Sequence, residues 1–323
     1  MTGPEIHEKE KGVWILFLGA WLVGSDYLAY TELNFPPLIL QKETSSEGYD
    51  PATCKVWVRD AKSGKLSAFA PKQQNEISAP SGEILSDWLG DAFLTLSPDK
   101  KSIEIRNTEG KVQKMVEAPW AVHAKRVIAG NNTRWALSGD ENRLWLTHLD
   151  ANYQLVKETP LATSRDFWGN SKILFNSKTN KLWVGFAETK PSHAYSPTVL
   201  RVDPDGKIEA KFEWNERGLF FDVCLDSESV LISRDMPSLP YTVPVYSTLE
   251  AIPEAGKAST YYQADANLFI DGMICETDRI LMVQRSIFGS DGSYLVDWNR
   301  KSGSTGKQLF RLPSPIRKLY ACP

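Results

Sequence analysis

Alternating apolar and polar residues recur along the chain in short runs, each followed by a polar turn and a second run. The clearest copies begin at Cys54, Ser102 and Thr198, and each has a Gly-Lys pair in its turn. Alternation with a period of two places successive side chains on opposite faces of a strand, and Gly beside polar residues is typical of a tight turn. Each copy therefore predicts a β-hairpin.

Weaker copies begin at Leu144, Thr242 and Tyr294, so the chain contains six predicted hairpins. The equivalent positions lie 43 to 53 residues apart: Asp60, Asn107, Asp150, Asp203, Ser247 and Asp297. This spacing leaves room for two more strands per repeat and is typical of β-propeller blades. The sequence predicts an all-β fold, a six-bladed β-propeller of four-stranded antiparallel blades, preceded by one N-terminal transmembrane helix.

The order of strands can be followed in one blade and at the chain's end. We expect Phe220–Leu225 to be an innermost strand, Val230–Ser233 the second and Thr242–Tyr246 the third. The run Ile316–Cys322 is typical of an innermost strand but has no strands after it. We expect it to complete the N-terminal blade, because this pairing would close the ring and remove two exposed edges.

The N-terminal part differs from these repeats, because residues 12–31 are almost entirely apolar and Asp26 interrupts them only near their end. About 20 apolar residues are enough for a membrane-spanning helix. The aromatic residues expected at its membrane interface are Trp21, Tyr27 and Tyr30. A cleaved signal peptide and a buried propeller strand are the alternatives, and both stay open.

Positive charge favours one orientation of this segment. Lys9 and Lys11 precede it, and the next basic residue is Lys42. Since basic residues are enriched on the cytoplasmic side, the N-terminus is predicted to be cytoplasmic. The predicted organisation is a cytoplasmic tail at 1–11, a single-pass anchor through the lipid bilayer at 12–31, a spacer at 32–37 and a periplasmic or otherwise extracytoplasmic propeller at 38–323.

Composition and motifs exclude several functions. The net charge of -3 and the pI near 5.9 give no broad basic surface, so nucleic acid is not an expected partner. The sequence contains no Gly-x-Ser-x-Gly elbow, phosphate-binding loop, dinucleotide-binding glycine pattern or Cys-x-x-Cys zinc pair. These absences disfavour classical hydrolase and nucleotide chemistry.

Alignment of the expected innermost strands places one polar residue per blade near the same level: Asp87, His123, Asp166, Asp222, Asp271 and Lys318. Because innermost strands line the central channel, these side chains are candidates for binding a hard cation or a polar ligand. The alternative is a structural ring whose polar groups bind water and backbone amides. No cofactor is predicted, and a calcium-like divalent ion is the alternative.

The hairpins and the acids on the inner strands resemble six-bladed propeller superfamilies, which include gluconolactonase and strictosidine synthase-like proteins and NHL or YVTN-type repeats. The lactonase-like members bind a divalent metal in the channel. The resemblance implies Asp166, Asp222 and Asp271 as metal ligands here. His123 and Lys318 depart from that ligand pattern.

The cysteines add one structural prediction. Cys224 and Cys275 fall late in the innermost strands of adjacent blades, where they can pair as a disulfide. Such a bond would fit an extracytoplasmic location. Cys54 and Cys322 are expected toward opposite ends of the closing blade, which disfavours a bridge between them.

Two classes of function follow. The first is a membrane-anchored binding or scaffolding subunit of a multi-protein complex, such as a photosynthetic or respiratory one, with the other subunits as partners. It is favoured because the chain has an apparent anchor and no convincing catalytic set. The alternative is a metal-dependent extracytoplasmic hydrolase, such as a lactonase, with its site in the channel.

Overall fold

The computed structural model of the chain describes much of the range 56–320, all of it in the second of two compact units, Pro37–Pro323. The described residues are 56–60, 66–70, 73–76, 85–86, 89, 92–107, 111–130, 133–163, 167–189, 195–214, 220–225, 229–236, 246–253, 259–264, 268–275, 279–286, 293–299, 307–312 and 316–320.

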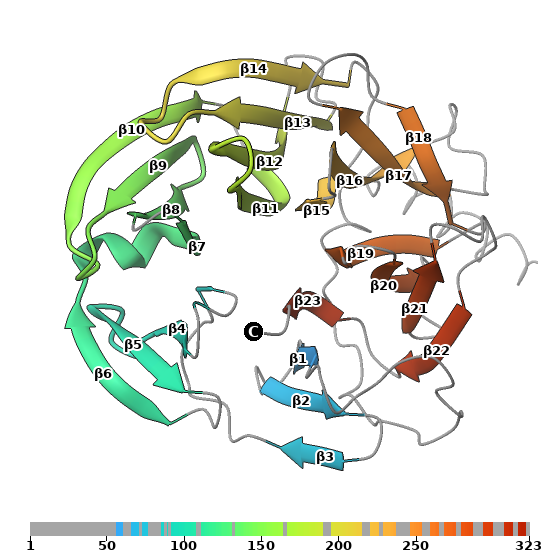
Figure 1. Ribbon diagram of the computed structural model, residues 1–323, viewed down its shortest axis with the longest axis horizontal. Helices are drawn as coiled ribbons and strands as arrows, with labels where there is room; N and C mark the ends of the chain where they lie inside the picture. Colours follow the sequence, from blue (N-terminus) through green and yellow to red (C-terminus); the bar gives the residue numbers. More distant parts are fainter. Residues whose placement is uncertain are drawn as a thin grey trace, which may run out of the picture. The chain divides into compact units, whose positions relative to one another are not determined.

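The described strands form six antiparallel sheets (Figure 1). The closing sheet, in the order β23-β1-β2-β3, consists of Ile316–Tyr320, Val56–Asp60, Leu66–Ala70 and Gln73–Glu76. The next contains β4 (Ala92–Leu96), β5 (Ser102–Asn107) and β6 (Val112–Glu117). A 3-10 helix, η1 (Pro119–His123), leads to β7 (Ala124–Gly130), β8 (Thr133–Gly139), β9 (Arg143–Leu149) and β10 (Leu155–Thr163).

The three remaining sheets each contain four strands in sequence order. The first consists of β11 (Phe167–Asn176), β12 (Lys181–Thr189), β13 (Tyr195–Val202) and β14 (Ile208–Glu213). The second consists of β15 (Phe220–Leu225), β16 (Ser229–Met236), β17 (Tyr246–Pro253) and β18 (Ser259–Gln263). The third consists of β19 (Leu268–Cys275), β20 (Arg279–Ser286), β21 (Ser293–Asn299) and β22 (Lys307–Leu312).

These sheets confirm an all-β propeller with four-stranded antiparallel blades, but they correct the blade count. Five blades have four strands, and β4–β6 form a three-stranded sheet. Leu85 and Ser86 lie between β4 and β7, because the Leu85 N–H donates to the Leu94 carbonyl and Ser86 pairs in parallel with Val127. The prediction of six four-stranded blades is therefore wrong.

The predicted closure of the ring is confirmed. β23 pairs antiparallel with β1, in the register Trp57 with Tyr320 and Val58 with Leu319. The C-terminal strand thus completes a sheet whose other strands come from the N-terminal part of the propeller. In Figure 1 β23 is the strand of this sheet nearest the centre of the ring, and β3 is the outermost.

The hydrophobic core consists of separate clusters, each between two successive sheets. The strand β12 shows how the sequence produces this arrangement. Leu182 and Val184 pack against the β7–β10 sheet, whereas Trp183 between them packs against the β15–β18 sheet. Because successive side chains of a strand point to opposite faces, a blade with a neighbour on each side needs apolar residues at both odd and even positions.

Side-chain hydrogen bonds stabilise the turn between the last two strands in three of the sheets. The Asn107, Asp150 and Asp203 side-chain oxygens accept hydrogen bonds from the backbone N–H four residues later, at 2.8 to 2.9 Å. Gly206 in the last of these turns has φ of 94°, and a Cβ atom there would lie 2.8 Å from Thr159. Its left-handed backbone and this close approach both favour glycine.

Three details of the predicted repeat are wrong. Asp60 ends β1, which is the second strand of its blade and not the third. Ser247 lies near the start of β17 and not at its end, where the strand turns toward β18. The third strand of this blade is β17, so the strand predicted at Thr242–Tyr246 begins too early. By contrast, β15 and β16 occupy the predicted first and second positions.

The predicted tail, anchor and spacer at residues 1–37 lie outside the described residues, as do Trp21, Tyr27 and Tyr30. Within the described part of the chain, no helix combines the length and apolar character needed to cross a membrane.

Candidate functional site

The innermost strands share an irregularity at one level. In β7, β15 and β19 one residue is skipped in the pairing with the second strand, and in β11 the shift spans three residues. The residues that resume the pairing after these shifts are Arg126 in β7, Lys172 in β11, Asp222 in β15 and Gly272 in β19. Such bulges redirect side chains and are frequent beside functional sites.

Two of these residues form a buried ion pair between neighbouring blades. The Lys172 Nζ atom lies 2.6 Å from Asp222 Oδ1, and each side chain is 9% exposed. Burial lowers the pKa of Lys172 to about 8; the charge of Asp222 opposes this change, and the positive charge of Arg126 adds to it. Arg126 is itself buried, so charged side chains from three consecutive blades interact at this level.

The carboxylate of Asp222 also contacts the blade on its other side. Asp222 Oδ2 accepts a hydrogen bond from the Met273 N–H of β19 at 2.7 Å. Asp222 Oδ1 accepts one from the N–H of Val223 at 2.8 Å. Both oxygens are therefore engaged, and the carboxylate links β11, β15 and β19. This is the geometry of a group that positions blades relative to one another.

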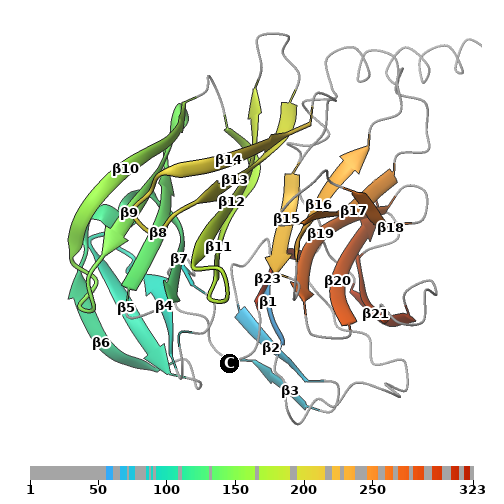
Figure 2. The same ribbon diagram turned by 45° about the horizontal axis from the view of Figure 1, so that its top comes forward.

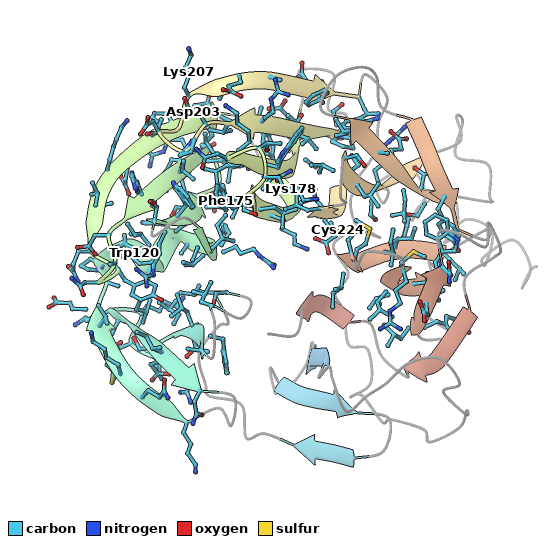
Figure 3. All side chains as sticks on the ribbon, in the orientation of Figure 1. Trp120, Phe175, Lys178, Asp203, Lys207 and Cys224 are labelled. Atoms are coloured by element: carbon cyan, nitrogen blue, oxygen red, sulfur yellow. A yellow bond between two sulfur atoms is a disulfide. The ribbon has the colours of Figure 1, made fainter. Side chains whose placement is uncertain are left out.

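A disulfide lies beside this contact. The structure joins Cys224 of β15 to Cys275 of β19, with their Cα atoms 5.7 Å apart. Figure 3 shows Cys224 where the sheets of β15 and β19 meet, and Figure 2 shows these two strands adjacent from a second direction. The pair is the one that the sequence suggested, and it connects the same two strands as the hydrogen bond from Met273 to Asp222.

Only part of the predicted ring can be placed. His123 ends η1 and is exposed, with its ring centroid 5.6 Å from that of Trp145. Asp271 and Lys318 lie within the register shifts of β19 and β23, but their side chains are outside the described part. Asp87 and Asp166 are also outside it. Of the predicted residues, Asp222 alone has a described side chain at the shared level.

The alignment of β7 and β11 was out of register, so sequence reasoning missed Arg126 and Lys172. The bulges are the cause, because they add residues that simple alternation does not count. A better signal was present: each position after the shift is followed by two apolar residues. These pairs are Val127–Ile128, Ile173–Leu174, Val223–Cys224 and Met273–Ile274. Alignment on the apolar pairs would have placed cations on β7 and β11 in the ring.

The proposed metal ligands stay predictions, with one new constraint. The described residues contain no group of three or more His, Cys, Asp or Glu side chains placed to hold a metal ion. The proposal needs Asp166 and Asp271 together with Asp222. Since Asp222 is bound to Lys172 and two backbone N–H groups, it would have to exchange these partners for a metal.

A second buried ionic cluster lies within the β15–β18 blade. The guanidinium of Arg234 contacts Glu250 Oε1 at 2.7 and 2.8 Å, and both residues are buried. The Trp214 indole N–H donates to the other Glu250 oxygen at 2.6 Å, and its ring lies 5.6 Å from the guanidinium carbon. These contacts use both carboxylate oxygens, so the cluster joins β16 and β17 to the residue that follows β14.

Comparisons with known proteins support the fold and not a family. No family profile matches the chain, and no curated protein matches its sequence significantly. Solved structures do match. Hydrazine synthase of Kuenenia stuttgartiensis is 12% identical, with a TM-score of 0.50 over 75% of this chain and 70% of that chain. A chain of a nidogen/laminin complex is 9% identical, with a TM-score of 0.55 over 84% and 98%.

A third match has no described activity. It is a protein of unknown function from Bacteroides caccae, 12% identical, with a TM-score of 0.53 over 84% of this chain and 99% of that chain. At these identities the matches establish the β-propeller fold alone, because one propeller architecture carries many unrelated functions.

Proposed function

We propose that this protein is a non-catalytic binding or scaffolding β-propeller in a multi-protein membrane complex. The observation that supports this proposal is that the described buried charged groups bind one another or the backbone. Lys172, Asp222 and the backbone of Met273 hold three blades together, and Arg234 with Glu250 holds one blade internally. Charged groups that bind one another rigidify the platform and are not available to bind a substrate.

Two further points agree with this proposal. A similar fold occurs in hydrazine synthase and in a chain of the nidogen/laminin complex. The second of these structures is a complex of two different proteins. The outer strands β6 and β10 also expose aliphatic side chains, with Met115 59% and Val156 60% exposed. Contiguous exposed apolar patches mark protein contacts, and we propose that these side chains belong to a partner surface.

The location in this proposal is the one that the sequence suggested. Residues 12–31 anchor the chain in the bilayer, and the propeller lies on the periplasmic or extracytoplasmic side. The disulfide between Cys224 and Cys275 supports such a location, because disulfides persist in oxidising compartments. A photosynthetic or respiratory complex is the kind of assembly proposed.

Gentle extraction of the native protein tests this function. Mass spectrometry of the intact particle would identify its neighbours and any bound metal together. We expect stoichiometric partner subunits that dissociate only in stronger detergent. A solitary monomer with no stable neighbour would contradict the scaffold. A solitary protein with one tightly bound divalent ion would instead favour the channel hydrolase with Asp166, Asp222 and Asp271 as ligands.

A further inference from the structure

The turn between β13 and β14, residues 203–207, lies against the preceding blade. The Trp135 indole N–H of β8 donates to the Pro204 carbonyl oxygen of this turn at 3.0 Å. The Trp135 side chain is buried, and a buried indole N–H needs an acceptor because an unsatisfied buried donor is costly. The acceptor comes from the next blade, so this hydrogen bond joins two blades.

Two contacts with β10 hold the same turn. The Lys157 ammonium group donates to the Asp205 carbonyl oxygen at 3.2 Å. Gly206 packs closely on Thr159, because a Cβ atom at Gly206 would lie 2.8 Å from the Thr159 side chain. Figure 3 shows Lys207, the last residue of this turn, at the outer rim of the ring. Three consecutive residues of the turn thus contact the neighbouring blade.

The turn between β9 and β10, residues 150–154, makes similar contacts with the elements before its own blade. The Trp120 indole N–H of η1 donates to the Tyr153 carbonyl oxygen at 2.9 Å. The Gln154 amide reaches the Glu117 carbonyl oxygen at the end of β6, at 3.5 Å. In both turns a tryptophan from outside the turn's own blade binds a carbonyl oxygen of the turn. The arrangement recurs in two consecutive blades.

Tyr153 makes its contact in a strained backbone conformation. It occupies the position that Gly206 has in the other turn, and its φ is 63°. This left-handed conformation suits glycine and is unusual for a bulky residue. The Tyr153 ring is buried, and the Arg134 guanidinium carbon lies 4.4 Å from its centroid. Packing of the ring offsets the strain and holds the turn in place.

We propose that residues 150–154 and 203–207 are straps that fasten each blade to the elements before it. The strand that begins directly after each strap, β10 or β14, lies at the end of its sheet order and pairs with one strand of that sheet. Opening of the strap should therefore release this outermost strand while the rest of the ring stays folded. The device goes beyond the scaffold, which does not require coupled blades.

Hydrogen exchange of the full chain, read by mass spectrometry of its peptides, tests the strap at 203–207. The variant Trp135→Phe removes the indole N–H and keeps an aromatic ring at this position. The matched control is Trp145→Phe, because the Trp145 indole N–H donates to Glu158 within a single blade. A second variant, Lys157→Met, removes the other polar contact at an exposed position.

In Trp135→Phe we expect the backbone N–H groups of 203–213, the strap and β14, to exchange about fivefold faster or more, as for the loss of one hydrogen bond. Lys157→Met should have a smaller effect on the same peptides, and Trp145→Phe should leave them at the wild-type rates. Wild-type rates in both strap variants would overturn the proposal, as would an equal acceleration by the control. None of these outcomes affects the test for partner subunits.

Discussion

The two sides of β15 are joined to their neighbours by different chemistry. Toward β11 the polar contact is the ion pair between Lys172 and Asp222. Toward β19 the contacts are the disulfide from Cys224 to Cys275 and the hydrogen bond from the Met273 N–H to Asp222. One interface should therefore respond to pH and the other to reductant, and Asp222 is the residue that both share.

Removal of Asp222 should have the largest effect, because it weakens both interfaces at once. Asp222→Ala leaves the buried Lys172 ammonium without its carboxylate and the Met273 N–H without its acceptor. Breaking a buried ion pair from one side costs about 3–5 kcal/mol, so we expect a loss of this size in the free energy of unfolding. Urea denaturation followed by tryptophan fluorescence would measure it.

A matched control is Asp205→Ala, which removes an exposed carboxylate from the turn before β14. Its change should stay within about 0.5 kcal/mol, as for most surface substitutions. If Asp222→Ala were as stable as this control, Asp222 would have no role in joining the blades.

Loss of the disulfide should affect only the interface with β19. The double variant Cys224→Ser with Cys275→Ser removes a link between residues 51 apart in sequence. Cross-links of this kind stabilise proteins by about 2–4 kcal/mol, mainly by restricting the unfolded chain. We expect a lower melting temperature without dithiothreitol, and little further change when dithiothreitol is added. A wild-type protein insensitive to dithiothreitol under the same conditions would contradict this expectation.

The pH dependence should distinguish the ionic interface. Burial lowers the pKa of Lys172 to about 8, from an ordinary 10.5. Between these values the unfolded chain binds more protons than the folded one, so the contribution of Lys172 to stability rises with pH. The slope is at most about 1.4 kcal/mol per pH unit, and the contribution is constant below the folded pKa.

The measurement is urea denaturation at several pH values from 7 to 10 for the wild type, Lys172→Met and Lys114→Met. We expect Lys172→Met to be less stable throughout, because Asp222 stays buried without its cation. Above pH 8, the free energy of unfolding of Lys172→Met should not show the rise with pH that Lys172 contributes in the wild type. Lys114→Met, at an exposed position of the outer strand β6, should still show this rise. Parallel curves for all three proteins would show that Lys172 titrates as an exposed lysine.

Sequence patterns predicted the hairpins where local chemistry determines the turn. Asp150 and Asp203 accept hydrogen bonds from the backbone of their own turns, and this capacity is visible in the sequence. Ser247, which was aligned with these two residues, lies near the start of a strand and not at a turn. Residues 237–245 separate β16 from β17, which moves the third strand later than a regular repeat would place it. In the structure the Ser247 hydroxyl accepts a hydrogen bond from the Ile270 N–H of β19.

The candidate site was harder to predict than the blades. Its residues follow bulges, and the three-residue shift in β11 breaks the period of two by which Asp166 was aligned. Two partners of Asp222, the Lys172 ammonium and the Met273 N–H, also lie about 50 positions away in the sequence, in the two neighbouring blades. Such pairings depend on how blades pack, which no local pattern encodes.

The smallest effect is expected for an ion pair away from the inter-blade contacts. Glu209 on β14 forms ion pairs with Lys181 and Arg201, and its side chain is 27% exposed. Exposed pairs contribute about 0–1 kcal/mol because water and salt screen them. Glu209→Gln should therefore lower the free energy of unfolding by no more than this, with a difference from wild type that vanishes in 1 M salt.

The comparison with Lys172→Met then tests burial itself. Both substitutions remove one member of an ion pair between strands, but only Lys172 and Asp222 are buried, and only they join different blades. A loss for Glu209→Gln as large as that for Lys172→Met would mean that the inter-blade pair has no special weight. A several-fold smaller loss, sensitive to salt, would assign the stability of the ring to its inner strands.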